Sequence, residues 1–287
     1  MEALQRIQFL NRNLHHKINL LNRMFSIKTV PLVFAAALLT LAGCATPNAS
    51  SSRAERSQFY ELRVYSTHSE GQQKRISDHW QNAAIPAYNR IGVQSIGVFT
   101  EHQDSPTNHV YVLLPFDSAE QFAIAQEKLL ADATYQQAAA DYANLPKEQA
   151  AFDKLESSLL IAFKGMPRMA SLPATGDRSA WVFELRTYFS PSESRGWNKI
   201  KMFNDGEIKV MQDVGLAPLF FGQNLTGTQL PALTYMTCGE TLEEHQKHWR
   251  AFGSAPGWNA LKNDPQYKDN MTGMSRVILK RTAASQL

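Results

Sequence analysis

A polar motif of alternating residues occurs twice in this sequence. The motif is Glu-Leu-Arg-x-Tyr, and its polar residues are Glu61, Arg63 and Tyr65 in the first copy and Glu184, Arg186 and Tyr188 in the second. Alternate residues of a β-strand face the same side of a sheet, so each set shares one face. Arginine offers forked donors and tyrosine a hydroxyl, which suit a small anionic or carbonyl-bearing ligand. The two sets are therefore the candidate ligand site.

A structural role for the same side chains is the alternative. A buried carboxylate and a buried guanidinium can satisfy each other and hold the register of a sheet, whereas removing one partner costs about 3–5 kcal/mol. A catalytic carboxylate would in addition need a strongly shifted pKa. The residue types leave both interpretations open.

Two histidines and one cysteine are further candidates for chemistry. His245 and His248 stand three apart, which on a helix could bring both imidazoles to one metal ion. The spacing differs from His-Glu-x-x-His, and the first half has Phe122 and Ala125 at the matching positions, so a solvated helix face is the competing interpretation. Cys238 lies in an apolar stretch and is expected to be an inert strand residue. We expect no bound metal or other cofactor.

The excess of basic residues lies in the first 43 residues. The whole chain has 29 Lys and Arg against 26 Asp and Glu, and five of the basic residues but one of the acidic residues fall in this leader. The rest of the chain is close to neutral, which removes the electrostatic basis for binding nucleic acid. The sequence also contains no phosphate loop, Gly-x-Ser-x-Gly elbow or Cys-x-x-Cys pair, which argues against nucleotide, hydrolase and redox functions.

Residues 1–43 have the character of a leader, and residues 24–43 that of its signal peptide. A short basic start precedes an apolar run from Val30 to Leu41, which is shorter than the roughly 20 residues of a membrane span. The small residues before Cys44 resemble a bacterial lipobox, whose cysteine is lipidated and begins the mature chain. Cys44 is thus the predicted lipid anchor in the membrane, and residues 44–57 are a flexible polar tether.

The signal predicts a location in the bacterial cell envelope. Ala45 follows the cysteine in place of the aspartate associated with inner-membrane retention, so the resemblance favours the outer membrane, facing the periplasm. An ordinary signal peptide or an uncleaved anchor is the alternative. Because residues 1–23 are long for a signal, translation could start at Met24 instead of Met1.

The chain repeats itself at an offset of 123 residues, and the repeat predicts the fold. Each copy begins with a strand, residues 59–65 in the first, followed by an amphipathic helix that Gly92 or Gly215 ends. Pro86 is expected to kink or split the first of these helices. Strands over 93–101 and 109–114, a second helix, and a strand over 158–164 complete the first copy.

The order of elements is βαββαβ twice, that is, two tandem ferredoxin-like units of an α+β protein. Such a sheet has helices on one face only, so the second copy is expected to cover the first in an intramolecular dimeric α/β barrel. In this arrangement Tyr60, Leu62 and Val64 would face the helices. The candidate ligand site would line the barrel interior.

Several of these features resemble the NIPSNAP domain. They are the opening motif of each copy, the helix ending in Gly92 or Gly215, the strand after Asn108, and Trp258 near Asp264-Pro265. Residues 58–164 and 181–281 are identified as NIPSNAP-like domains joined by a linker over 165–180. The resemblance implies the dimeric α/β barrel superfamily, in which some members bind haem. The corresponding haem-ligand candidates are His68, His79, His102 and His109.

The first copy departs from the family pattern in a longer stretch, Asp141 to Lys147, after its second helix.

The leader and the predicted barrel are compatible with two functional hypotheses. The first is an envelope lipoprotein that uses its barrel to bind a small molecule or a protein partner and could form homo-oligomers. The second is a small-molecule enzyme, monooxygenase- or isomerase-like, that uses the barrel cavity. An enzyme would need an open cavity with an unpaired His, Tyr or Arg at its wall.

Overall fold

The predicted order of elements occurs twice in the computed structural model, which describes residues 56–102, 108–172 and 178–287. The first repeat contains β1 (Phe59–Ser66), α2 (Glu70–His79), η1 (Trp80–Ala84), α3 (Ile85–Arg90), β2 (Gly97–Glu101), β3 (Val110–Phe116), α4 (Ala119–Ala131), α5 (Ala133–Ala138), α6 (Ala140–Ala143), η2 (Lys147–Gln149) and β4 (Lys154–Ala162). The leader, Cys44 and most of the tether lie outside the described residues.

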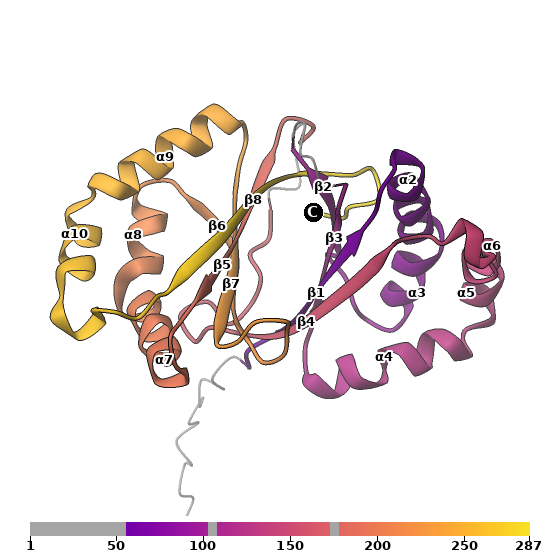
Figure 1. The fold of residues 1–287 in the computed structure, drawn as a ribbon, viewed down its shortest axis with the longest axis horizontal. Coiled ribbons are helices and arrows are strands. Elements are labelled where there is room, and N and C mark those ends of the chain that lie inside the picture. Colours follow the sequence, from indigo (N-terminus) through magenta and orange to yellow (C-terminus); the bar gives the residue numbers. More distant parts are fainter. Residues whose placement is uncertain (1–55, 103–107, 173–177) are drawn as a thin grey trace, which may run out of the picture. The chain divides into compact units, whose positions relative to one another are not determined.

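The second repeat follows the same plan (Figure 1). It contains β5 (Val182–Phe189), α7 (Glu193–Met202), η3 (Phe203–Glu207), α8 (Ile208–Asp213), β6 (Ala217–Asn224), β7 (Ala232–Gly239), α9 (Leu242–Ser254), α10 (Pro256–Asn263), η4 (Pro265–Tyr267) and β8 (Gly273–Arg281). Within the described residues, none of the helices is both long and apolar enough to cross a membrane.

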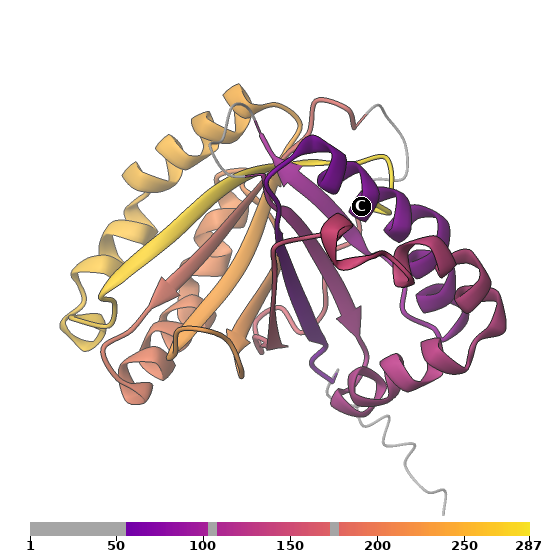
Figure 2. The ribbon, with the colours of Figure 1, turned by 45° about the vertical axis from the view of Figure 1, so that its right-hand side comes forward.

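The eight strands form one closed antiparallel barrel in the order β1-β3-β2-β8-β5-β7-β6-β4. Each repeat supplies four adjacent strands, and the pairs β2–β8 and β4–β6 join the two sheets. The helices of each repeat cover the outside of its own sheet (Figure 2). The predicted α+β fold and intramolecular barrel are confirmed.

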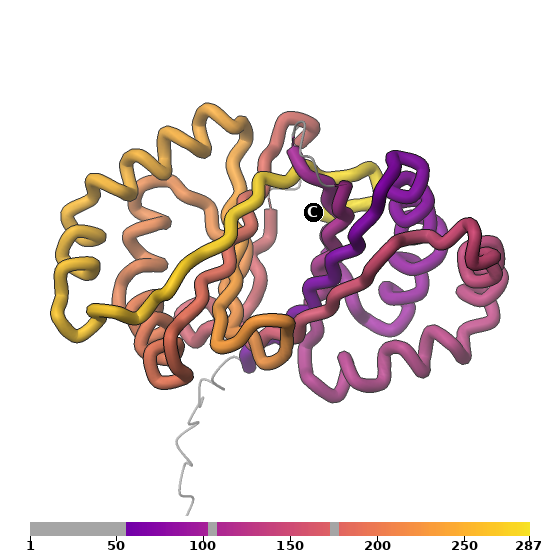
Figure 3. Tube along the Cα trace, in the orientation of Figure 1, coloured from indigo at the N-terminus to yellow at the C-terminus, as the bar shows by residue number. Residues whose placement is uncertain are grey.

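Strand direction shows how the two repeats are related. Because neighbouring strands are antiparallel around the closed ring, β1, β2, β5 and β6 all run the same way. The carboxyl ends of these four strands therefore meet at one end of the barrel, and equivalent positions of the two repeats face each other across its axis. The C-terminal residues leave β8 and lie against the first repeat, where the Gln286 N–H donates to the Ile96 carbonyl (Figure 3).

The long helix of each repeat contains a π-helical segment at the same aligned position, η1 in the first and η3 in the second. Pro86 lies at the start of α3, as expected for a helix that is split there. The second repeat has Lys209 at the position of Pro86, and its segment contains a kink at Gly206, whose backbone angles (φ 172°, ψ −24°) are not helical. Gly92 and Gly215 end the helices at φ +84° and +87°, which confirms their predicted role.

The two faces of the first strand are the reverse of what the pattern predicted. Tyr60 and Leu62 lie in the apolar core inside the barrel, whereas Tyr65 packs against the helices. The prediction is wrong for the whole set of motif residues, because Glu61, Arg63, Tyr65, Glu184, Arg186 and Tyr188 all point toward the helices. Both faces of each sheet are buried, so alternation alone does not indicate which face is which.

Candidate functional site

The motif residues of the first repeat form a paired charge cluster under its helices. Arg63 donates from Nε and Nη2 to the two carboxylate oxygens of Glu61 at 2.7 and 2.9 Å. Its Nη2 also donates to the Tyr88 hydroxyl at 3.0 Å, and Ser157 donates to Glu61 at 2.8 Å. Burial alone would lower the pKa of Arg63, but Tyr88 and Glu61 outweigh it and raise that pKa. Arg63 is therefore held in its charged form, and the two side chains satisfy each other's hydrogen bonds.

The second repeat surrounds the same motif with different partners. Arg186 donates to Glu184 at 2.7 Å, and its guanidinium lies 3.5 Å from the centre of the Trp249 indole. The His245 Nε2 lies 2.7 Å from the other Glu184 oxygen, and both residues are almost fully buried. Burial would raise the pKa of Glu184, but the bonds from His245 and Arg186 lower it overall. The carboxylate is therefore held in its ionised form.

A second buried ion pair lies close to this cluster. Lys199 and Glu207 are 2.7 Å apart, and each side chain is 2% exposed. The ammonium lies 4.8 to 5.6 Å from the centres of three aromatic rings, those of Phe203, Tyr188 and Trp258. This pair was not predicted from the sequence, although the repeat offset contained a signal. Lys199 and Glu207 are charged residues whose aligned counterparts in the first repeat are Ile76 and Ala84.

The histidine pair proposed as weak metal candidates is divided between two environments. His245 is buried against Glu184, whereas His248 is about one-third exposed and lies 3.9 Å from Glu244. His245 is thus not part of a solvated helix face. Over the described ranges, three or more His, Cys, Asp or Glu side chains do not come together as metal ligands. Cys238 is buried in β7, and burial raises the pKa of its thiol to about 12.

His79 occupies a site that is special to the first repeat. Its ring stacks on Tyr142 with centroids 3.9 Å apart, and Tyr142 belongs to the stretch that lengthens this repeat. Burial and the Arg63 charge lower the pKa of His79 to about 4, so the imidazole is neutral at pH 7. Its Nδ1 is buried and has no hydrogen-bond partner. The residue borders a surface groove of about 420 Å³ between α2 and α6.

A larger cavity lies at the barrel end where β1, β2, β5 and β6 finish. We call it the mouth cavity. It has a volume of about 610 Å³ and is lined by strands of both repeats. Its polar wall includes Glu101, His109, Tyr111, Thr187, Asn224 and Thr234. Leu62, Leu185 and other apolar side chains of the barrel core form its floor.

The polar side chains of this wall are ordered by hydrogen bonds. The Tyr111 hydroxyl donates to Glu101 Oε1 at 3.0 Å, and the His109 Nδ1 lies 3.1 Å from the same oxygen. On the opposite wall, Thr234 donates to the Asn224 side-chain oxygen at 2.9 Å. Burial and the Glu101 charge raise the pKa of Tyr111, so its hydroxyl stays a donor. The cavity therefore has a fixed pattern of polar groups above an apolar floor.

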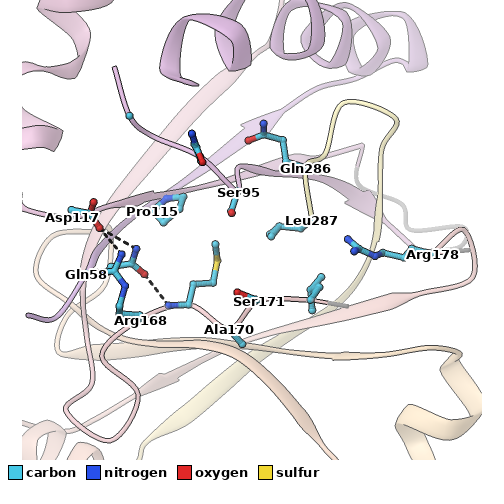
Figure 4. A pocket seen from close by; sticks show the side chains of 14 residues that line it. Gln58, Ser95, Pro115, Asp117, Arg168, Ala170, Ser171, Arg178, Gln286 and Leu287 are labelled. Atoms are coloured by element: carbon cyan, nitrogen blue, oxygen red, sulfur yellow. Dashed lines mark hydrogen bonds and ion pairs between the residues drawn. The ribbon is translucent and has the colours of Figure 1, made fainter. Parts of the chain in front are cut away.

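The opposite end of the barrel also has a cavity, of about 460 Å³, in which Gln58, Asp117 and Arg168 are engaged with one another or with the linker backbone (Figure 4). Arg168 donates to Asp117 at 2.7 Å, and the Met169 N–H donates to Gln58 at 2.8 Å. The buried side chain of Leu287 lies at this end. These contacts attach the linker and the C-terminal residues to the barrel, so the mouth cavity is the better candidate site.

The mouth cavity was not predicted from the sequence. Glu101 and His109 were expected at the ends of two strands, and His109 was a candidate only as a haem ligand. A signal was present in the repeat, because the 123-residue offset aligns Glu101 with Asn224 and Tyr111 with Thr234. Polar residues at matching strand positions of both copies would have indicated a shared polar wall.

Comparison with known proteins identifies the family. Residues 60–164 and 183–286 both match the model of the NIPSNAP family. A search of curated proteins finds no match. A NIPSNAP-like domain protein from Burkholderia xenovorans is 17% identical, with a TM-score of 0.33, and the match covers 38% of this chain and 91% of that one.

Two solved structures resemble the whole barrel. A candidate monooxygenase from Fusobacterium nucleatum subsp. nucleatum is 10% identical with a TM-score of 0.54, and the match covers 79% of this chain and 93% of that one. A second candidate monooxygenase, from Lactobacillus acidophilus, is 8% identical with a TM-score of 0.53, covering 79% and 94%. At these identities the likeness shows the shared fold alone.

Proposed function

Because the chain belongs to the NIPSNAP family, we propose that it is an envelope lipoprotein that binds a small molecule in its mouth cavity. The observation that carries the binding role is the cavity itself, about 610 Å³ in volume and walled by both repeats. Concave sites of this size, with an apolar floor and a few placed polar groups, are typical of small-molecule sites. The motif residues under the helices are paired with one another, which favours a structural role for them.

The envelope location rests on the signal-like leader and on Cys44. Replacing Cys44 with Ser should release the protein from the membrane fraction of the cell, because one thiol is the only group that the lipid attachment needs. Continued membrane association of that variant would contradict anchoring through Cys44. The original protein and the variant keep the same leader, so a difference in their membrane association reflects the cysteine.

The binding role can be tested by native mass spectrometry of the full chain extracted from the envelope. We expect a retained small molecule. Val64 faces the cavity, and Val64→Trp should fill it and abolish retention. Leu130→Trp is the matched control, because Leu130 is 57% exposed on α4 and outside the cavity. Equal retention by both variants would contradict the mouth cavity as the site.

A small-molecule enzyme is the second candidate, and the Glu101–His109–Tyr111 group is the observation that favours it. A carboxylate, an imidazole and a phenol within hydrogen-bond distance could move a proton in an isomerase-like reaction. Incubating the protein with its retained molecule in heavy water separates the two candidates. Deuterium at a carbon of that molecule would indicate catalysis, and a molecule returned unlabelled would indicate binding alone.

Self-association is a separate part of the proposal. The sheet edges that two ferredoxin-like units use to form a barrel are already joined within this chain, through β2–β8 and β4–β6. A homo-oligomer would therefore use the outer surface. Light scattering of the released Cys44→Ser protein would measure its oligomeric state.

A further inference from the structure

The two walls of the mouth cavity are built on the same plan with different charge. The repeat offset relates Glu101 to Asn224 and Tyr111 to Thr234. In each repeat a hydroxyl on the third strand donates to a side-chain oxygen at the end of the second, at 3.0 Å in the first and 2.9 Å in the second. The acceptor is a carboxylate in the first repeat and an uncharged amide in the second.

The first-repeat wall carries the negative charge of the cavity. Glu101 has a side chain only 7% exposed, which weakens the screening of its charge by water. Glu156 on β4 also lines the cavity and lies 2.9 Å from Lys154, whose side chain is 62% exposed. Two basic residues also line the cavity: His109 contacts Glu101, and Arg276, whose side chain is 58% exposed, has its Nε 3.8 Å from Glu184.

The second-repeat wall supplies hydroxyl and amide groups in addition to Arg276. Thr187 and Thr234 are 2.9 Å apart and lead to Asn224, so this side offers hydroxyl and amide groups. Below both walls the floor is apolar, with Leu62 and Leu185 buried in the barrel core. A ligand that matches all three surfaces has a positive group at one end of an apolar body.

We propose that the mouth cavity takes a small organic cation, such as a primary amine carried on a compact apolar group. This inference rests on the proposed binding function and adds the class of ligand. The amine meets the Glu101 side, where a carboxylate strengthens its hydrogen bonds, and the apolar body rests on Leu62 and Leu185. This class differs from the small anionic or carbonyl-bearing ligand that the motif residues suggested, because those residues face the helices.

Benzylamine, benzyl alcohol and benzoate test the class, since they share a ring and differ in charge. Isothermal titration with the full detergent-extracted chain should show benzylamine binding most tightly. Glu101→Gln replaces the carboxylate of the first wall with an amide, as in the second wall, and should weaken the binding of benzylamine by about tenfold or more. Asn224→Asp is the reciprocal change and should tighten benzylamine or leave it unchanged. Benzyl alcohol should respond to neither change.

Each outcome bears on the inference. Tightest binding of benzoate, or unchanged benzylamine affinity in Glu101→Gln, would overturn the cationic class while leaving the cavity a binding site. If none of the three binds, the cationic class is overturned, and if Val64→Trp also retains the native molecule, the proposed binding function itself fails. Thermal melting checks that the variants fold. If Glu101→Gln does not fold, Glu156→Gln and Asn224→Asp supply the charge comparison, and equal benzylamine affinity in both would overturn the inference.

Discussion

The two repeats share a motif and a fold but satisfy their buried charges differently. In the first, Glu61 and Arg63 complete their bonds with Tyr88 and Ser157. In the second repeat, the His245 imidazole lies within hydrogen-bond distance of Glu184, and a further ion pair, Lys199–Glu207, lies nearby. The positions of that pair are apolar in the first repeat. This fold therefore accepts either an ion pair or apolar side chains between sheet and helices, provided that each buried charge has a partner nearby.

The largest expected effect comes from breaking the Lys199–Glu207 pair. Lys199→Ile alone leaves a buried carboxylate without its partner, and we expect a loss of about 3–5 kcal/mol in the free energy of unfolding. The double variant Lys199→Ile/Glu207→Ala introduces the residues of the first repeat and should recover most of that loss. Urea unfolding measures both. Equal losses in the single and double variants would show that the second repeat depends on the pair itself.

The next largest effect is a loss of folding stability at low pH that arises in the first repeat. His79 has a pKa of about 4 in the folded chain, below the ordinary value of about 6.5. Below pH 6.5 the unfolded chain therefore takes up a proton that the folded chain refuses. The resulting loss of stability should reach about 3 kcal/mol by pH 4 and be absent at pH 7.

His79→Met tests this, because the second repeat has Met202 at the aligned position. Urea unfolding of both proteins at pH 7, 5.5 and 4 gives the comparison. The stability of the variant should fall less steeply with acid. Parallel curves would refute the assignment of the acid sensitivity to His79.

A smaller loss is expected from His245→Phe, which introduces the aligned residue of the first repeat. Glu184 keeps Arg186 but loses one charge-assisted bond, worth about 1.5–3 kcal/mol in a buried site. His248→Phe on the same helix is the control and should change stability by about 0.5 kcal/mol or less. An unchanged unfolding midpoint for His245→Phe would mean that Arg186 alone satisfies the carboxylate.

The smallest effects come from the two helix-ending glycines. Alanine at φ near +85° is strained, so Gly92→Ala and Gly215→Ala should each cost about 1–2 kcal/mol. A new Cβ would lie 3.6 Å from Gln121 at Gly92 but 2.9 Å from His248 at Gly215. The second variant should therefore be slightly less stable in thermal melting. Adding His248→Ala should remove the difference, and a persistent difference would point to the backbone instead.

Much of the fold could be predicted because it depends on local signals that occur twice. The helix ends at Gly92 and Gly215 follow from the left-handed φ that glycine tolerates, and the strand order follows from the repeated sequence of elements. Strand limits were less accurate. β2 begins at Gly97 instead of Val93, after a turn in which Ser95 has a φ of +58°, and β4 starts at Lys154 instead of Ser158. These limits depend on which partner strand is available for pairing.

The candidate site could be predicted only in part. The motif residues were recognised as polar partners, but the mouth cavity brings together Glu101, Tyr111, Asn224 and Thr234 from strands far apart in the sequence. Their proximity follows from closure of the barrel through β2–β8 and β4–β6, and neither pairing is encoded by local spacing.

By itself, the sequence determined the duplicated architecture, the family and the turn positions, because these rest on local conformational preference and on self-similarity. Only the tertiary structure decided which face of each strand lies inside the barrel. Both faces are buried, one against helices and one against the opposite sheet, so hydrophobic alternation satisfies either choice. The helices supplied the partners that Arg63 and Arg186 require, and the barrel interior took the apolar side chains. At the mouth of the barrel, the polar side chains of the interior face are a carboxylate on one side, Glu101, and an amide on the other, Asn224.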